Sequence, residues 1–285
     1  MDSLISGSIA GIVADVVTHP MGTVKTRLQV QGASSSSLTK YSGVGQGLTR
    51  ILSTEGVGAL YQGVGVVVVT AAPAQGLFFL GNDLARDALR PHLPAAAASF
   101  AAGFFAQLCG SLCWVPMDTV KERLQVEGQL RLGSQARLGG SWNAVRTIWG
   151  REGLRGFYPA YWVHQATWAP FNGIFFAIYE GLKGIADERG YPTLPCGIIA
   201  GVVAGSLTNP MDLVKTRLQV ARADPSTFAY DGALDCARQI LRREGPLAFL
   251  DGAVARCATV APRLTICVLV KDAIMPGVKG MVSSD

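Results

Sequence analysis

The chain has 285 residues, of which 49% are hydrophobic and only 16% are charged, and its mean hydropathy is +0.30. Soluble domains carry about 25% charged residues, so this composition favours a membrane protein. The net charge of +5 is spread over short, separated basic segments, which argues against nucleic-acid binding and favours contact with anionic lipid.

The first predicted element is an apolar helix over Leu4–Thr18. It is expected to end near the segment Pro-Met-Gly-Thr-Val-Lys-Thr-Arg-Leu-Gln at 20–29, where the proline ring removes an amide donor and should kink or tighten the helix end. A polar connection with a short amphipathic helix over Gly43–Thr54 follows, and then a second apolar helix over roughly Gly63–Arg86. Polar and helix-breaking residues interrupt every stretch of about 20 residues, which is typical of helices that line a water-filled path.

This pattern occurs twice more along the chain. The proline segment recurs at 116–125 and 210–219, so the copies are 96 and 94 residues apart. A Glu-Gly pair follows each copy, at Glu55, Glu152 and Glu244, and an acid comes 28 residues after each of these pairs. Three landmarks kept in phase through three copies indicate an internal repeat.

The later copies predict four more apolar helices and another short amphipathic helix. These are expected over Ala98–Val115, Ala160–Lys183, Gly197–Thr208, Gly252–Met275 and, for the short helix, Gly232–Arg243. Three repeats, 1–94, 95–190 and 191–285, therefore predict an all-α membrane protein with six transmembrane helices and both termini on one side. Most Lys and Arg residues lie in the connections within the repeats, which assigns those connections to one face of the membrane.

The three proline segments closely resemble the signature of the mitochondrial carrier family, Pro-x-Asp-x-x-Lys-x-Arg-x-Gln, and the resemblance covers essentially the whole chain. It implies three pseudosymmetric repeats around a central cavity in a multi-pass protein of the mitochondrial inner membrane. The basic connections, with their short amphipathic helices, would face the matrix, and the termini would face the intermembrane space. The resemblance also implies a transporter of a small molecule that works by alternating access.

The resemblance assigns a matrix-side gate to the signature. Acids and bases three residues apart at a helix end can pair with the neighbouring repeats and close the cavity floor, with the signature glutamines as braces. The residues so assigned are Lys25, Gln29, Asp118, Lys121, Gln125, Asp212, Lys215 and Gln219. The alternative is a salt bridge within each repeat, worth about a few tenths of a kcal/mol. Gly22 stands where the first acid is expected, so we expect one of the three lysines to be unpaired and the gate to be weak.

A second gate, on the cytoplasmic side, is implied near the ends of the even-numbered apolar helices. The family motif there is aromatic-acid-x-x-base. The residues so assigned are Asp83 and Arg86 in the first repeat, Tyr179, Glu180 and Lys183 in the second, and Asp272 in the third. The third repeat has Met275 in place of the base, and the alternative for all three copies is ordinary charge at a helix end.

Glycines at helix starts are candidate lipid sites, because they leave backbone amides open to an anion. The candidates are Gly43, Gly63, Gly232 and Gly252. In related carriers these positions hold cardiolipin phosphates, so cardiolipin is the expected lipid partner. Asp251 is an awkward neighbour for a phosphate at the last of them.

By analogy with the family, substrate is held midway along the even-numbered apolar helices. Aligning the three helices places these side chains on the pathway: Thr70, Gln75, His164, Thr167, Trp168, Asn172, Arg256, Thr259 and Arg263. Asp15 is the only acid in the apolar part of the odd-numbered helices. A charge within a membrane is energetically costly, so Asp15 is a candidate functional residue. Both signs of charge in one cavity favour a zwitterion, with Asp15 on its cationic group and Arg263, helped by Arg256, on its carboxylate. The alternative is an internal ion pair between Asp15 and Arg256.

Individual residues resemble features of two carrier subgroups. Asp15 resembles a feature of S-adenosylmethionine carriers, and Pro73 and Pro170 share a pattern with mitoferrins. We expect an amino acid or an amino-acid-derived cofactor such as S-adenosylmethionine, with a mitoferrin-like metal carrier or a non-transporting lipid-binding protein as alternatives. No catalytic or phosphate-loop motif is present, so we expect no enzyme, no resident cofactor or metal, and a monomer.

Overall fold

The computed structural model describes residues 2–33, 40–130, 138–224 and 228–282, except for the side chains of 2–8, 95, 96, 99, 100, 268 and 271–282. This part of the chain contains six long helical spans. They are α1 (Asp2–Val30), α4 (Val64–Leu89), α5 (Ala95–Val126), α7 (Tyr161–Arg189), the consecutive helices α8 (Leu194–Leu207) and α9 (Asn209–Ala221), and α11 (Ala253–Val282). The predicted all-α fold with two long helices per repeat is confirmed.

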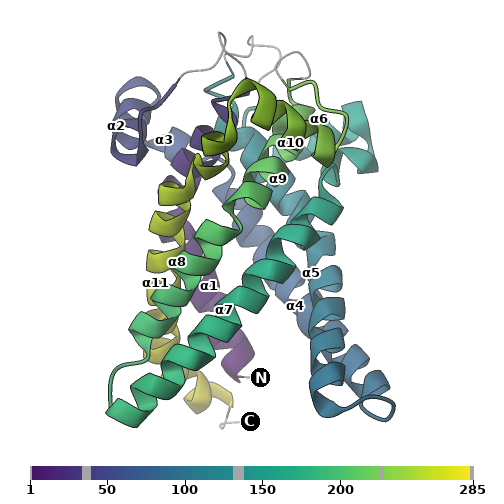
Figure 1. The fold of residues 1–285 in the computed structure, drawn as a ribbon, viewed down its shortest axis with the longest axis vertical. Helices are drawn as coiled ribbons and strands as arrows, with labels where there is room; N and C mark the ends of the chain where they lie inside the picture. Colours follow the sequence, from purple (N-terminus) through teal and green to yellow (C-terminus); the bar gives the residue numbers. More distant parts are fainter. Residues whose placement is uncertain (1, 34–39, 131–137, 225–227, 283–285) are drawn as a thin grey trace.

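The long helices form a ring in chain order. Each of α1, α4, α5, α7 and α8 packs on the next helix along the chain, and α11 closes the ring by packing on α1. In Figure 1 the helices lie close together near the short helices α2, α6 and α10 and spread apart toward the end where both chain termini lie. We call these two ends of the molecule the short-helix end and the terminal end.

Hydropathy alone marks few of these helices as membrane spans. Among the described residues, the stretch Val57–Leu89 qualifies by length and apolar character, and α8 with α9 qualifies as a second span if the bent pair counts as one. The other long helices carry polar and charged side chains at intervals. Such side chains are tolerated within a membrane when they face the interior of a bundle, which is where the ring places the signature charges.

Short helices cover the short-helix end. They are α2 (Val44–Thr54), α3 (Val57–Leu60), α6 (Ser141–Glu152), η2 (Leu154–Phe157), α10 (Ala233–Arg243) and η3 (Pro246–Leu250). In α2, α6 and α10 one isoleucine at the same position in each repeat, Ile51, Ile148 and Ile240, is fully buried. Ile51 belongs to a core cluster with Val24 and Leu28 of α1, and the other two isoleucines lie in clusters with the corresponding residues of α5 and α9. The amphipathic pattern of each short helix thus fixes it to its own repeat.

The prediction that the first apolar helix of each repeat ends near the signature proline is wrong for two of the three repeats. Helices α1 and α5 continue through Pro20 and Pro116. Only the third span breaks, by a 64° bend between α8 and α9 at Thr208. A proline inside a helix removes one backbone hydrogen bond, and the apolar packing of the segment beyond it outweighs that loss.

Candidate functional site

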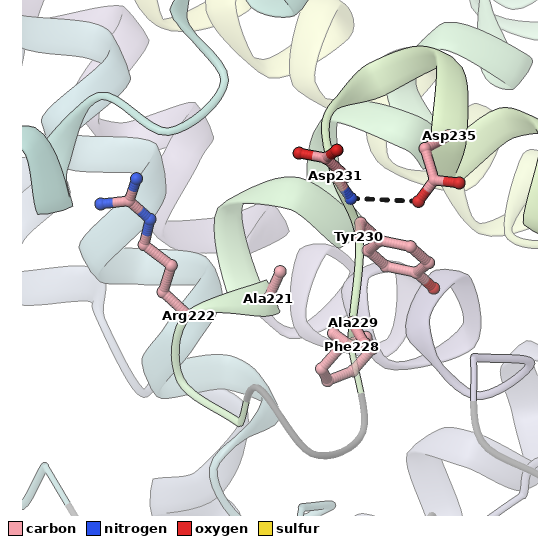
Figure 2. Close-up of a pocket in the computed structure, with 7 residues that line it drawn as sticks. All are labelled: Ala221, Arg222, Phe228, Ala229, Tyr230, Asp231 and Asp235. Carbon is pink, nitrogen blue, oxygen red and sulfur yellow. Dashed lines mark hydrogen bonds between the residues drawn. The ribbon is translucent and has the colours of Figure 1, made fainter.

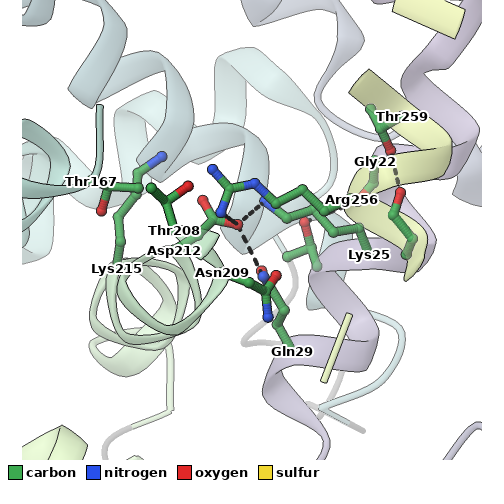
Figure 3. A network of polar contacts seen from close by, with 12 residues as sticks. Gly22, Lys25, Gln29, Thr167, Thr208, Asn209, Asp212, Lys215, Arg256 and Thr259 are labelled. Carbon is green, nitrogen blue, oxygen red and sulfur yellow. Dashed lines mark hydrogen bonds and ion pairs between the residues drawn. The ribbon is translucent and has the colours of Figure 1, made fainter. Parts of the chain in front are cut away.

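Three signature segments, one from each repeat, meet at the short-helix end, where α1, α5 and α9 contact one another. Lys25 Nζ lies 2.5 Å from Asp212 Oδ2, and Lys215 Nζ lies 2.5 Å from Asp118 Oδ2. Both ion pairs join different repeats, and Asp118, Asp212 and Lys215 are buried. Figure 3 shows Lys25, Gln29 and Arg256 directed at Asp212 from two neighbouring helices. We call Lys25, Asp118, Lys121, Asp212 and Lys215 the signature cluster.

The expected unpaired lysine is not found. Lys121, the lysine that faces the repeat with Gly22, bonds to Asp118 Oδ1 of its own helix at 2.6 Å. Asp118 therefore serves two lysines, one within its repeat and Lys215 across to the next. The prediction of one free lysine failed because it allowed each acid only one partner, whereas a carboxylate has two oxygens and about four acceptor positions.

The three signature glutamines have different partners. Gln29 Nε2 donates to Asp212 Oδ2 at 2.9 Å and so contacts an ion pair of the signature cluster. Gln125 instead accepts a bond from the Thr26 hydroxyl at 2.9 Å. Gln219, turned so that its amide nitrogen faces α5, donates to the carboxylate of Glu122 at 2.6 and 3.3 Å. The brace role of the glutamines stays a prediction.

The signature arginines form a second cyclic set of contacts. In each repeat the arginine pairs in bidentate fashion with the glutamate of the Glu-Gly landmark: Arg27 with Glu55, Arg123 with Glu152 and Arg217 with Glu244. We call these the three Arg–Glu pairs. Their guanidinium groups are buried almost completely.

The Nε of each arginine also reaches a neighbouring repeat. It donates to the backbone carbonyl of a signature glutamine, at 2.8 Å for Gln125, 3.0 Å for Gln219 and 2.9 Å for Gln29. In the sequence these arginines and glutamates stand out only as repeated positions without a role. Their similar spacing in the three repeats, 28, 29 and 27 residues, was the signal that could have paired them.

Asp15 lies opposite Arg263, not Arg256. Arg263 Nε on α11 donates to Asp15 Oδ1 on α1 at 2.5 Å, and Nη2 lies 3.5 Å from Oδ2. The side chains are 44% exposed for Arg263 and 28% exposed for Asp15, so the pair is accessible. The expected alternative, an internal pair between Asp15 and Arg256, is therefore wrong for this structure.

Arg256 lies deeper, beside the signature cluster. One Nη atom is 3.7 Å from Asp212 Oδ2, and the guanidinium stands 5.7 Å from the centre of the Phe171 ring. The residue is 5% exposed, and its Nη1 makes no hydrogen bond within the described part of the chain. A buried guanidinium with an unused donor is suited to bind an anion.

His164 and Trp168 line the same level on α7. His164 Nδ1 is 3.7 Å from Asp118 Oδ2, and its ring lies 6.1 Å from that of Trp168. Neither ring nitrogen of His164, nor Nε1 of Trp168, has a hydrogen-bond partner among the described residues. Unused buried donors and acceptors just inside the signature cluster mark this level as a candidate binding surface.

The other predicted substrate residues divide into two groups. Thr70, Thr167 and Thr259 each donate their hydroxyl to the carbonyl four residues earlier in their own helix, at 2.6 to 2.8 Å. They can therefore offer a ligand only an acceptor. Gln75 and Asn172 are half-buried and make no hydrogen bond within the described residues, so both ends of each amide are available.

At the terminal end, the described side chains of the predicted gate form no ion pairs with one another. Asp83, Glu180 and Lys183 are exposed, and among the described side chains no ion pair joins them to one another or to Arg86. The ring of Tyr179 stacks on Phe175 with centroids 5.8 Å apart, and the side chain of Asp272 lies outside the described residues. The ion pairs between signature segments thus lie at the short-helix end, and the described gate residues at the terminal end remain apart.

Two of the candidate lipid glycines have a packing function. A Cβ at Gly63 would lie 2.9 Å from Lys121 Cα, and one at Gly252 would lie 2.7 Å from Gln29 Cγ. Both glycines also have positive φ angles, so α4 and α11 can each begin this close to the signature segment of another repeat only where the residue has no side chain. Lipid binding at these positions stays a prediction.

The start of α10, at Gly232, already carries a carboxylate. Figure 2 shows Asp235 beside the Asp231 backbone, at the edge of an open depression of about 560 Å³, and Asp235 Oδ2 accepts the Asp231 N–H at 3.0 Å. This bond, with a second one from Gln239, holds the pKa of Asp235 below its ordinary value. A lipid phosphate at Gly232 would therefore meet a like charge, whereas the start of α2 at Gly43 has the neutral Gln46 in the same position.

Comparison with known proteins covers the whole chain. A family model described as mitochondrial carrier protein matches residues 1–93, 94–190 and 187–281. The chain is 35% identical over 276 residues to mitochondrial substrate carrier family protein E of Dictyostelium discoideum, which covers 91% of this chain and 90% of that protein. It is 30% identical over 300 residues to mitochondrial glutamate carrier 1 of Mus musculus, covering 94% and 91% of the two chains. It is 34% identical over 270 residues to the human electrogenic aspartate/glutamate antiporter SLC25A12, covering 91% of this chain but only 38% of the antiporter.

Proposed function

The chain belongs to the mitochondrial carrier family, and from that membership we propose that its substrate is an acidic amino acid of the glutamate type. As a member it is a multi-pass transporter of the mitochondrial inner membrane that moves a small metabolite, and it is not an enzyme. The named relatives that transport a stated substrate are glutamate and aspartate/glutamate carriers. The likeness to S-adenosylmethionine carriers and mitoferrins gives way to this assignment.

The accessible ion pair between Asp15 and Arg263 carries the proposal. The ammonium and α-carboxylate of an amino acid bear the same two charges as this pair. A substrate can therefore replace each partner, with its ammonium on Asp15 and its carboxylate on the planar guanidinium of Arg263. Asp15 belongs to the first repeat and Arg263 to the third, so a substrate that binds both couples two repeats.

Arg256 supports an acidic rather than a neutral side chain. It lies seven residues before Arg263 on α11, which places it on the same face about 10 Å along the helix axis. Two guanidiniums and one carboxylate carry a net charge of +1, which complements the net charge of −1 on glutamate. The unused Nη1 of Arg256 gives the second carboxylate a buried donor.

Substrate binding in this arrangement can change the conformation of the carrier. A ligand shifts an equilibrium between two states only by its differential affinity for them. Arg256 contacts Asp212 of the signature cluster. A substrate carboxylate that draws Arg256 away therefore weakens the electrostatic attraction between Arg256 and Asp212. The binding level and the ion pairs at the short-helix end are linked through this one guanidinium.

Ligand-induced stabilisation of the purified carrier tests the proposal. A ligand that binds only the folded state at about 100 times its Kd stabilises by about 2.7 kcal/mol, which a thermal melt detects. We expect L-glutamate to raise Tm more than L-glutamine or S-adenosylmethionine at equal concentration. Asp15→Asn and Arg263→Ala should each remove the glutamate shift, and Asp83→Asn, an exposed acid at the terminal end, should keep it.

Two results would count against this assignment. The first is an unchanged glutamate shift in both Asp15→Asn and Arg263→Ala. The second is that each single variant loses basal stability, that the double variant regains it, and that all three still respond to glutamate. That pattern would make Asp15 and Arg263 a structural pair.

A further inference from the structure

We propose that Glu122 is the third acid of the signature cluster and compensates for the acid that is missing at Gly22. The proposal rests on the geometry of the short-helix end and is independent of which substrate the carrier moves. Glu122 follows Lys121 directly in the sequence, outside the three acid positions of the signature. It is therefore a gate residue that the signature alone does not identify.

The position of Glu122 is the first observation. Its side chain is only 4% exposed, and its Oε1 lies 3.7 Å from Lys215 Nζ, in the neighbouring repeat. The amide nitrogen of Gln219 donates to both carboxylate oxygens, at 2.6 and 3.3 Å. A buried carboxylate is costly unless charges and hydrogen bonds compensate it, and both are present here.

The comparison of repeats is the second observation. The residues that follow the signature lysines are Thr26 in the first repeat, Glu122 in the second and Thr216 in the third, and all three are buried. The ion pairs follow a cycle, with Lys25 bonded to the acid of the third repeat and Lys215 to the acid of the second. That cycle would pair Lys121 with position 22, where the glycine offers no acid. The extra acid thus stands in the one repeat whose lysine lacks its partner.

The charge balance is the third observation. Three lysines lie within 4 Å of Asp118, Asp212 or Glu122, so the formal charges of the cluster balance with Glu122 and leave one excess positive charge without it. Arg256 adds one more positive charge at 3.7 Å from Asp212. Arg256 is also the residue that we propose binds the second carboxylate of the substrate.

Position 22 has room for the missing acid, which makes the proposal testable. A Cβ at Gly22 would have Gln125 Nε2 as its nearest neighbour, at 3.9 Å. The test is a double-mutant cycle of Glu122→Gln and Gly22→Asp, with Tm of the purified carrier as the readout. Glu127→Gln is the matched control, because Glu127 is a buried acid directly after α5 that accepts the Leu138 backbone N–H and has no lysine partner among the described residues.

We expect Glu122→Gln to lower Tm by about 3–8 °C, since it leaves the three lysines of the buried cluster with only two acids. Adding Gly22→Asp should restore most of that loss, because it returns a carboxylate to the partner position of Lys121. In the wild-type background Gly22→Asp should raise Tm less than it does with Glu122→Gln, because it adds a fourth acid to a neutral cluster. Gly22→Asp should not rescue Glu127→Gln.

Additive effects of Glu122→Gln and Gly22→Asp on Tm would overturn the proposal. Additivity would mean that Glu122 acts only locally, in packing or in holding Gln219, because an acid in another repeat cannot replace a local contact. Equal rescue of Glu127→Gln would overturn it too. If Glu122→Gln alone does not fold, restored expression of a folded carrier by Gly22→Asp supports the proposal, and failure to restore it overturns the proposal.

Discussion

At the scale of single residues, two glycines leave the space that two of the Arg–Glu pairs occupy. A Cβ at Gly128 would lie 2.0 Å from Glu55 Oε2, and one at Gly32 would lie 1.7 Å from Glu244 Oε2. Each glycine belongs to a different repeat from the glutamate it touches. The backbone of one repeat therefore passes directly over the ion pair of another, and only glycine leaves enough space.

Gly128→Ala should destabilise the carrier by about 2–3 kcal/mol, because the added methyl displaces Glu55 and leaves the buried Arg27 guanidinium without its partner. A chemical-denaturation or thermal melt of the purified protein measures this. Gly45→Ala in α2 is the control, since a Cβ there meets nothing within 4 Å and should stabilise the exposed helix slightly. Equal melting curves for Gly128→Ala and wild type would contradict the expectation.

Single residues also show the limits of reading function from the sequence. Asp15 could be recognised as a site residue because it is an acid in an apolar helix. Its partner could not be chosen between Arg256 and Arg263, because that choice depends on how α11 is placed beside α1. Glu122 was overlooked for a similar reason, since its position next to Lys121 says nothing about burial.

At the scale of elements, the three short helices share a place in the repeat but differ in the charge at their start. The residue three positions after the first glycine is Gln46 in α2 and Asp235 in α10, and each accepts a backbone N–H just before its helix. The positive end of a helix dipole favours an anion. In α10 the protein's own carboxylate occupies that place.

Exchanging these residues should exchange the lipid response. Asp235→Gln should increase the stabilisation of the purified carrier by added cardiolipin, because it removes a like charge from the start of α10. Gln46→Asp should decrease that stabilisation by the opposite change at α2. Melting curves across a cardiolipin titration measure both, and identical titrations for the two variants would contradict a phosphate site at either helix.

The elements themselves were largely predictable, with one systematic error. The repeat spacing and the apolar runs identify both long helices of every repeat and the amphipathic helices α2 and α10. The sequence around Pro20 and Pro116 predicts that the first long helix of these repeats ends there, because each proline removes a backbone hydrogen bond. This prediction considers local sequence alone. It does not count the burial of Val24 and Leu28 beyond the proline, which comes from packing against another element.

At the scale of the whole molecule, the contacts between repeats close into a cycle. Each arginine of the Arg–Glu pairs donates to the backbone of another repeat, and the ring of helices closes where α11 packs on α1. Ion pairs join the repeats at the short-helix end, while the predicted gate side chains that the structure describes at the terminal end remain apart. This is the arrangement expected of one of the two states of an alternating-access carrier.

This architecture could be predicted from the sequence, because three landmarks kept in phase through three repeats give the number and order of the membrane spans. The departures from threefold symmetry could not be predicted in the same way. The bond of Asp118 to Lys215 and the place of Glu122 depend on side chains from different repeats meeting in space. Such contacts are set by the assembled ring and leave no local pattern.

Uptake of radiolabelled L-glutamate into proteoliposomes containing the purified carrier decides whether the substrate is an acidic amino acid. We expect saturable uptake that excess unlabelled L-glutamate blocks and that excess L-glutamine leaves largely intact. Arg256→Gln should reduce this uptake, because the second carboxylate loses its donor. Uptake no greater than in protein-free liposomes, from a preparation that takes up S-adenosylmethionine or a neutral amino acid instead, would contradict the acidic amino-acid assignment.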